Sequence, residues 1–124
     1  MDGKKKILVI DDEEDTQNLL KTALERENFI VITANDGEAG IKAAELETPD
    51  LILLDIVMAN MDGYSCLKKI RGISKIKDTP VLILSAKEEE PLKDLFTFHK
   101  ISGYVEKPFE LYVLILRIKE LLKM

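Results

Sequence analysis

The segment Thr48–Gly63 constrains the fold most, because an unbroken apolar run within it ends in a single carboxylate. Leu51–Leu54 are all branched aliphatic residues, and a loop that closes in Asp62-Gly63 follows them. This pattern predicts a strand that is buried on both faces, in the middle of a sheet. Its last residue, Asp55, would project from the carboxyl edge, where open α/β sheets place their ligand and catalytic groups. On this segment alone, a capping role for Asp55 is an equally good interpretation.

Four further apolar runs alternate with segments of helical periodicity along the chain. The runs are Lys6–Ile10, Phe29–Ala34, Val81–Leu84 and Gly103–Glu106. The other segments repeat apolar residues at helical spacing, with a fourth helix beginning near Glu88–Pro91 and a fifth over about Glu110–Lys123. Five strands that alternate with five helices predict an α/β fold with a parallel sheet, right-handed crossovers and helices on both faces.

Composition and charge indicate one globular domain over residues 1–124. The chain has 46% hydrophobic and 33% charged residues, which is typical of such domains. No apolar run reaches the length of a membrane span, and Met1–Lys6 leads into a short strand and not into a signal-peptide apolar region, so we expect a cytoplasmic protein without membrane contact. The net charge of -5 argues against direct nucleic-acid binding. One cysteine and one histidine exclude a zinc ligand set, so any metal must be held by oxygen.

Polar residues stand where the predicted strands end, although the strand interiors are apolar. They are Asp11 and Asp12 after the first run, Asp55, Ser85 and Lys107. Three carboxylates in one pocket repel one another unless one retains a proton or a cation neutralises them. Mg²⁺ suits such an oxygen set and keeps open positions for phosphate oxygens. A lysine and a hydroxyl opposite the metal would complete a site for a phosphoryl group.

Five motifs in the same order and approximate spacing make the chain resemble the receiver domain of bacterial two-component response regulators. They are IDDE at Ile10–Glu13, PDLILLD at Pro49–Asp55, MDG at Met61–Gly63, SA at Ser85-Ala86 and GYVEKPF at Gly103–Phe109. The resemblance covers essentially the whole chain. It implies a CheY-like, flavodoxin-like (βα)5 fold with the strand order 2-1-3-4-5. It also implies a cis peptide between Lys107 and Pro108, which directs the lysine into the pocket.

The resemblance further implies the chemistry of the site. Asp55 would accept a phosphoryl group from a sensor histidine kinase or a histidine phosphotransfer protein. Mg²⁺ would be held by Asp11, Asp12, Asp55 and the main-chain carbonyl of Val57, and Lys107 would complete the site. Such a protein is a phosphoacceptor that assists its own phosphorylation and dephosphorylation, and it is not an enzyme in the usual sense.

A switch and an output surface are also implied. Ser85 matches the switch hydroxyl and Tyr104 the switch aromatic, and the family responds through its fourth helix, fifth strand and fifth helix. At 100° per residue, Tyr112, Val113 and Leu116 fall on the outer side of the fifth helix, which predicts a partner face beside Tyr104. We expect its occupant to be a downstream target, a fused output domain or, after phosphorylation, a second copy of the chain.

Three other functions fit parts of the pattern. A haloacid dehalogenase-type phosphatase also uses an aspartate nucleophile at a strand end, but it requires a second acid where Val57 stands. A flavodoxin-like cofactor binder would place Asp11, Asp12 and Glu13 against a phosphate, which three acids repel in the absence of a metal. A receiver fold kept only as a scaffold would not need the complete set of site residues.

Overall fold

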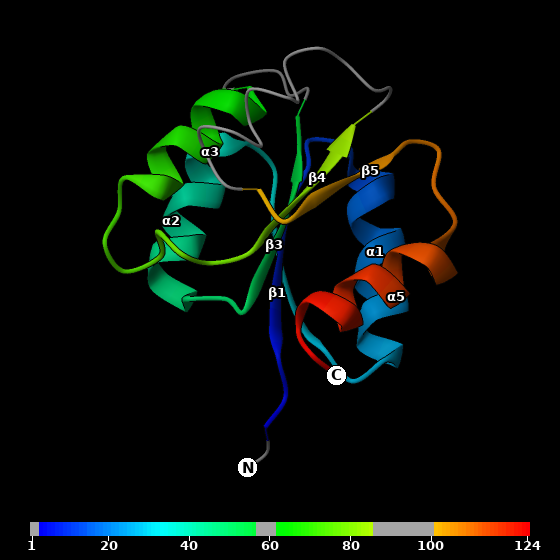
Figure 1. Ribbon diagram of the computed structural model, residues 1–124. Helices are drawn as coiled ribbons and strands as arrows, with labels where there is room; N and C mark the ends of the chain where they lie inside the picture. The colour runs from blue at the N-terminus through cyan, green and yellow to red at the C-terminus, as the bar shows by residue number, and fades with distance from the viewer. Residues whose placement is uncertain (1–2, 57–61, 86–100) are drawn as a thin grey trace.

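The computed structural model describes residues 3–56, 62–85 and 101–124, and this part of the chain forms one parallel sheet (Figure 1). The strands are β1 (Lys6–Ile10), β2 (Ile30–Ala34), β3 (Leu51–Asp55), β4 (Val81–Ser85) and β5 (Gly103–Glu106). Their order is β2-β1-β3-β4-β5, and every neighbouring pair is parallel. The predicted sheet, its strand order and the strand positions are therefore confirmed.

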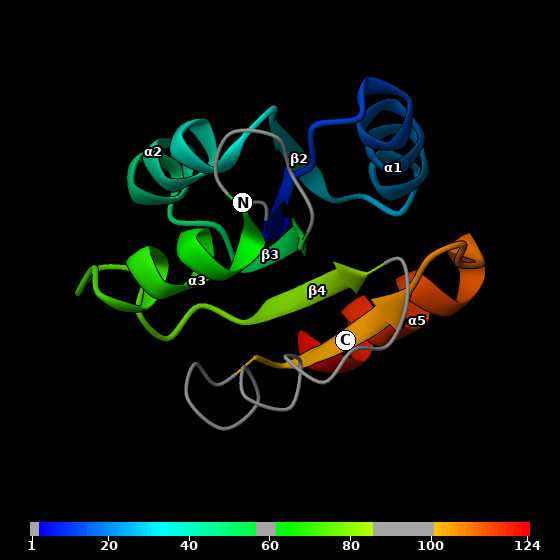
Figure 2. The same cartoon turned by 90° about the horizontal axis from the view of Figure 1, so that it is seen from above.

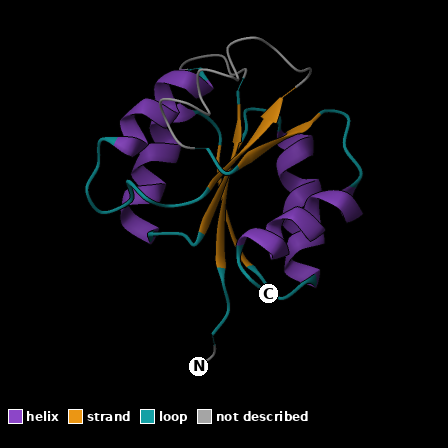
Figure 3. Cartoon of the chain, viewed as in Figure 1, coloured by secondary structure: helices purple, strands orange, loops and turns teal. Residues whose placement is uncertain are grey.

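Helices cover both faces of the sheet in the described part of the chain (Figure 2; Figure 3). They are α1 (Glu14–Arg26), α2 (Gly37–Glu47), α3 (Gly63–Arg71) and α5 (Leu111–Leu121). α1 and α5 lie on one face, and α2 and α3 lie on the other (Figure 1). The expected fourth helix, near Glu88–Pro91, lies outside the described residues. Within the ranges that are described, no helix is both long and apolar enough to span a bilayer.

β3 is buried on both faces, as its unbroken apolar run predicts. Successive side chains of a strand point to opposite faces, so Leu51 and Leu53 pack in the α1–α5 layer while Ile52 and Leu54 pack in the α2–α3 layer. Cys66 of α3 belongs to the second layer and is completely buried. Burial raises the pKa of its thiol to about 12, so this thiol is a poor nucleophile and Cys66 is a packed residue of the core.

α3 begins in direct contact with the end of β3. The Asp62 side chain accepts a hydrogen bond from the Ser65 amide at 2.8 Å and so caps the helix. A β-carbon on Gly63 would lie 2.6 Å from Cα of Ile56 and 2.7 Å from the carbonyl oxygen of Asp55. Glycine is needed here because any side chain would push the helix away from the backbone that carries Asp55.

α5 has the two apolar sides that its sequence predicts. Leu114 and Ile118 are completely buried against the sheet. Tyr112, Val113 and Leu116 have exposed fractions of 73%, 45% and 48%. Tyr104 of β5 was expected beside these three residues, but its side chain packs against the α2–α3 layer, on the other face of the sheet.

Candidate functional site

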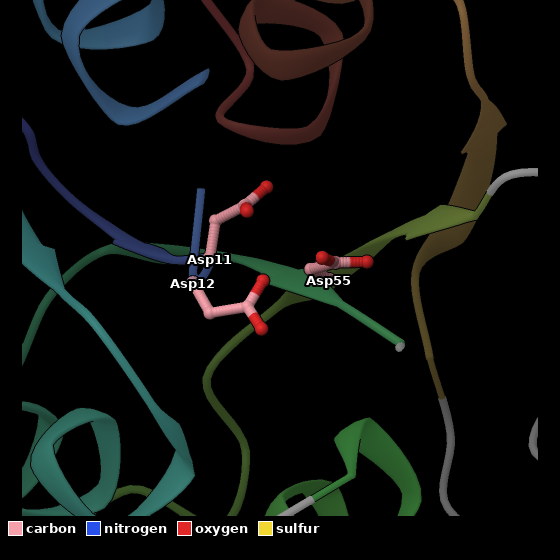
Figure 4. Close-up of side chains that lie close together, drawn as sticks. All are labelled: Asp11, Asp12 and Asp55. Carbon is pink, nitrogen blue, oxygen red and sulfur yellow. The ribbon is translucent and has the colours of Figure 1, made fainter. Parts of the chain in front are cut away.

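Three carboxylates meet at the carboxyl edge of the sheet. One carboxylate oxygen each from Asp11, Asp12 and Asp55 lies within 4.8 Å of the others (Figure 4). The strand register explains this: Ile10 of β1 pairs with Leu54 of β3, so the next residues of the two strands are neighbours. Asp11 and Asp55 are buried, with exposed fractions of 0% and 5%, whereas Asp12 is exposed. The sequence prediction that these three carboxylates meet in one place is confirmed, whereas their roles remain predictions.

Lys107 reaches the same cluster from the end of β5. Its Nζ lies 3.2 Å from Oδ2 of Asp11, 3.5 Å from Oδ2 of Asp55 and 3.7 Å from Oε1 of Glu13. Burial alone would lower the pKa of the Lys107 ammonium, but Asp55, Asp11 and Glu13 together raise this pKa above its ordinary value. The peptide between Lys107 and Pro108 is cis, as the sequence resemblance implied. The lysine is therefore a fixed positive charge beside Asp55.

Hydrogen bonds fix Asp11 on several sides. Its amide donates to the carbonyl of Ala34 at 3.1 Å, and its Oδ1 accepts from the Glu13 amide at 2.9 Å. Its main-chain carbonyl accepts from the side-chain amide of Gln17. Because Oδ2 faces Lys107, Asp11 has little freedom to turn out of the cluster. The structure thus holds Asp11 in place, and the exposed Asp12 follows it in the chain.

The remaining predicted site residues are only partly described. Ser85 is the last residue of β4 and pairs with Glu106 of β5. It follows Leu84, which pairs with Asp55. The position of the Ser85 side chain is not described. Val57, whose carbonyl was expected to bind the metal, lies outside the described residues. The roles of the Ser85 hydroxyl and of the Val57 carbonyl therefore remain predictions.

The chemistry of the cluster fits a divalent cation. Its three donors are hard oxygen ligands, and two of them are buried where unneutralised like charges repel strongly. Lys107 supplies one positive charge, so the three carboxylates retain an excess of negative charge. Asp11, Asp12 and Asp55 could therefore hold Mg²⁺. With a cation bound there, Asp55 would lie between that cation and Lys107, which suits a carboxylate that is to approach a phosphate.

Sequence reasoning missed two features next to the cluster. Gln17 is a buried polar residue of α1, and it stands three residues before Leu20 and seven before Leu24, both on the buried face. That spacing could have revealed it. Leu19 of α1 is apolar, but it is 51% exposed. It borders an open hollow of about 390 Å³ that is also lined by Thr16, Lys107, Pro108 and Phe109.

Comparisons with known proteins identify the family of the chain. The family model of the response regulator receiver domain matches residues 7–119. The alkaline phosphatase synthesis transcriptional regulatory protein PhoP of Bacillus subtilis (strain 168) is 43% identical over 119 residues, which cover 96% of this chain and 49% of that protein. The transcriptional regulatory protein ResD of the same organism is 38% identical over 118 residues, 95% of this chain and 48% of that protein. The chain spans about half the length of these curated relatives.

Solved structures show the same likeness. The chemotaxis protein CheY4 of Vibrio cholerae has a TM-score of 0.90 and 26% identity, and the match covers 96% of this chain and 99% of that one. The receiver domain of the Francisella response regulator 1452 has a TM-score of 0.86 and 32% identity, over 97% of this chain and 98% of that one.

Proposed function

The chain belongs to the family of response regulator receiver domains, and from this membership we propose that it is a signalling switch phosphorylated on Asp55. The observation that carries the proposal is the position of Asp55, which is buried at the end of β3 within 3.5 Å of Lys107 and beside two further acids. The proposed donor is the phosphohistidine of a sensor kinase or of a phosphotransfer protein. We propose further that residues 1–124 act as one receiver domain.

The proposed reaction is a phosphoryl transfer to a carboxylate. An oxygen of Asp55 forms a bond to phosphorus while the bond from phosphorus to the donor nitrogen breaks, and the electron pair of that bond stays on the donor imidazole. Lys107 offsets negative charge on the phosphoryl oxygens, and Ser85 is proposed to donate its hydroxyl to one of them. Mg²⁺, held by Asp11, Asp12, Asp55 and the Val57 carbonyl, would supply the positive charge that lets an anionic donor approach the acids.

The proposed output follows from the new charge on Asp55. The phosphoryl group adds negative charge and acceptor oxygens, which would draw Ser85 toward them and shift Tyr104. We propose that the partner face on the outer side of α5, formed by Tyr112, Val113 and Leu116, then binds a target, a fused output domain or a second copy of the chain. PhoP and ResD are named as transcriptional regulators, so an output in gene regulation is a proposal for the whole protein.

Intact-mass measurement after incubation with acetyl phosphate tests the proposed acceptor. The parent chain is expected to gain one phosphoryl group in the presence of Mg²⁺ and to gain none with a chelator, because the anionic donor is then repelled. Asp55→Asn should remain unmodified. Asp50→Asn is the matched control, since Asp50 lies at the opposite end of β3, and it should be modified like the parent. Modification of Asp55→Asn at the parental rate, or without Mg²⁺, would show that the site is assigned wrongly.

A further inference from the structure

Gln17 joins the acidic cluster to the end of the neighbouring strand. Its side chain is buried, with an exposed fraction of 6%, although it is polar. Its Nε2 donates to the main-chain carbonyl of Asp11 and, at 2.8 Å, to Oδ1 of Asn35. The carbonyl of Ala34, at 3.4 Å from the same nitrogen, is a third and more distant acceptor, so the two hydrogens of the primary amide are shared among three acceptors. The Gln17 amide is therefore fixed between the loop that follows β1 and the loop that follows β2.

The contact with Asp11 bears directly on the cluster. The carbonyl of Asp11 belongs to the planar peptide unit that joins Asp11 to Asp12. A hydrogen bond that holds this oxygen fixes the plane of the peptide, and with it the direction in which Asp12 leaves the end of β1. The other hydrogen bonds of Asp11 involve its amide and its carboxylate, so Gln17 is the partner of its main-chain carbonyl.

Repulsion makes such a fixed peptide necessary. Asp11, Asp12 and Asp55 bring like charges together, so their carboxylates repel one another unless the backbone that carries them is held. We propose that Gln17 is a positioning residue, whose amide holds the peptide between Asp11 and Asp12 so that both carboxylates stay in the arrangement that binds a divalent cation. Asn35 orients the amide for this task. The inference rests on the proposed function, because it assigns Gln17 a role in the same site.

The direct test compares Mg²⁺ affinity with fold stability in Gln17→Met. Methionine matches glutamine in length and fills the buried space, but it cannot donate to Asp11. Isothermal titration with Mg²⁺ alone should show a dissociation constant raised about tenfold, the scale known for groups that orient metal ligands. The Mg²⁺ concentration that gives half the maximal rate of phosphorylation by acetyl phosphate should rise in parallel. The rate at saturating Mg²⁺ should stay within about twofold of the parent, because Asp55 and Lys107 are unchanged.

Two further variants separate positioning from general stability. Leu24→Val trims a buried side chain on the same face of α1, so it should lower the melting temperature and leave the dissociation constant for Mg²⁺ unchanged. Asn35→Ala removes the side-chain acceptor of the Gln17 amide from an exposed loop position, so it should fold normally and raise the dissociation constant for Mg²⁺ by roughly threefold. This variant decides the question if Gln17→Met does not fold.

Each outcome bears on the proposal. An unchanged Mg²⁺ affinity in folded Gln17→Met, or in Asn35→Ala where that variant decides, would overturn the positioning role while the proposed function stands. Equal weakening in Leu24→Val would overturn it as well, because affinity would then follow stability alone. A parent chain that binds no Mg²⁺ would overturn the proposed function and this inference together.

Discussion

The two edges of the sheet use charged residues in opposite ways. At the amino edge the charges are matched: Nζ of Lys6 lies 3.2 Å from Oε1 of Glu47, and the Lys6 amide donates to Oδ2 of Asp50 at 2.7 Å. At the carboxyl edge Asp11, Asp12 and Asp55 lie close together, and the two buried members, Asp11 and Asp55, share one lysine. Matched charges serve the fold, whereas an excess of one sign lowers stability until a ligand neutralises it. The unmatched edge is therefore the one that we propose binds the cation and the phosphoryl group.

The direction of the helices also makes the two edges of the sheet electrostatically different. In alternating strands and helices, helices begin near the carboxyl edge of the sheet and end near the amino edge. The amino ends of α2 and α3 carry partial positive charge, and each is capped by an aspartate, Asp36 or Asp62. This partial charge helps the carboxyl edge to tolerate acids, but it cannot replace a full positive charge.

Substitution of Lys107, the lysine at the carboxyl edge, should give the largest change in the free energy of unfolding. Lys107→Met leaves Asp11 and Asp55 buried without a cation, so the free energy of unfolding in chelator should fall by about 3 kcal/mol. Mg²⁺ should restore part of this loss, because it binds the folded state. Urea denaturation with and without Mg²⁺ measures both quantities.

Lys6→Met at the amino edge is the matched control for that measurement. Its ion pair is partly exposed, so the free energy of unfolding should fall by only about 1 kcal/mol, with no response to Mg²⁺ beyond that of the parent. Equal losses in the two lysine variants would contradict the distinction between the edges.

A methyl group added at Gly63, the first residue of α3, should give the next largest change in the free energy of unfolding. Gly63→Ala places a β-carbon against the backbone of Asp55 and Ile56, so the free energy of unfolding should fall by about 2 kcal/mol. Mg²⁺ should also bind more weakly, because the backbone that carries Asp55 must move. Gly72→Ala, at the other end of α3, meets backbone only at 3.5 Å and should change stability by less than about 0.5 kcal/mol. Similar values for the two variants would refute close contact as the cause.

The outer side of α5 should give the smallest effect on stability. Leu116 is 48% exposed, so Leu116→Glu should change the free energy of unfolding by less than about 0.5 kcal/mol and leave phosphorylation of Asp55 intact. If this side is the partner face, sedimentation with beryllofluoride and Mg²⁺ should show dimers of the parent and monomers of the variant. Leu46→Glu, an exposed position on α2, is the control and should behave like the parent. Identical sedimentation of parent and Leu116→Glu would remove the outer side of α5 as a dimer surface.

The sequence by itself determined the sheet and most of the acidic site. An apolar run such as Leu51–Leu54 can be buried on both faces only inside a sheet, and alternation with helices makes the strands parallel. Parallel strands bring their carboxyl ends to one edge, so Asp11, Asp55 and Lys107 had to meet once the strand ends were known. These conclusions depend on local pattern and chain direction, which the sequence states directly.

Only the tertiary structure decided which side chains are buried and hydrogen-bonded and which are exposed. Gln17 is buried because the loops after β1 and β2 supply acceptors for its amide, and these acceptors come from separate segments of the chain. Leu19 follows the apolar period of α1, yet it is half-exposed at the hollow beside Lys107. Periodicity shows which residues share one face of a helix, whereas the width of the covered face depends on the neighbouring elements. That width follows from packing between distant segments, which no local pattern encodes.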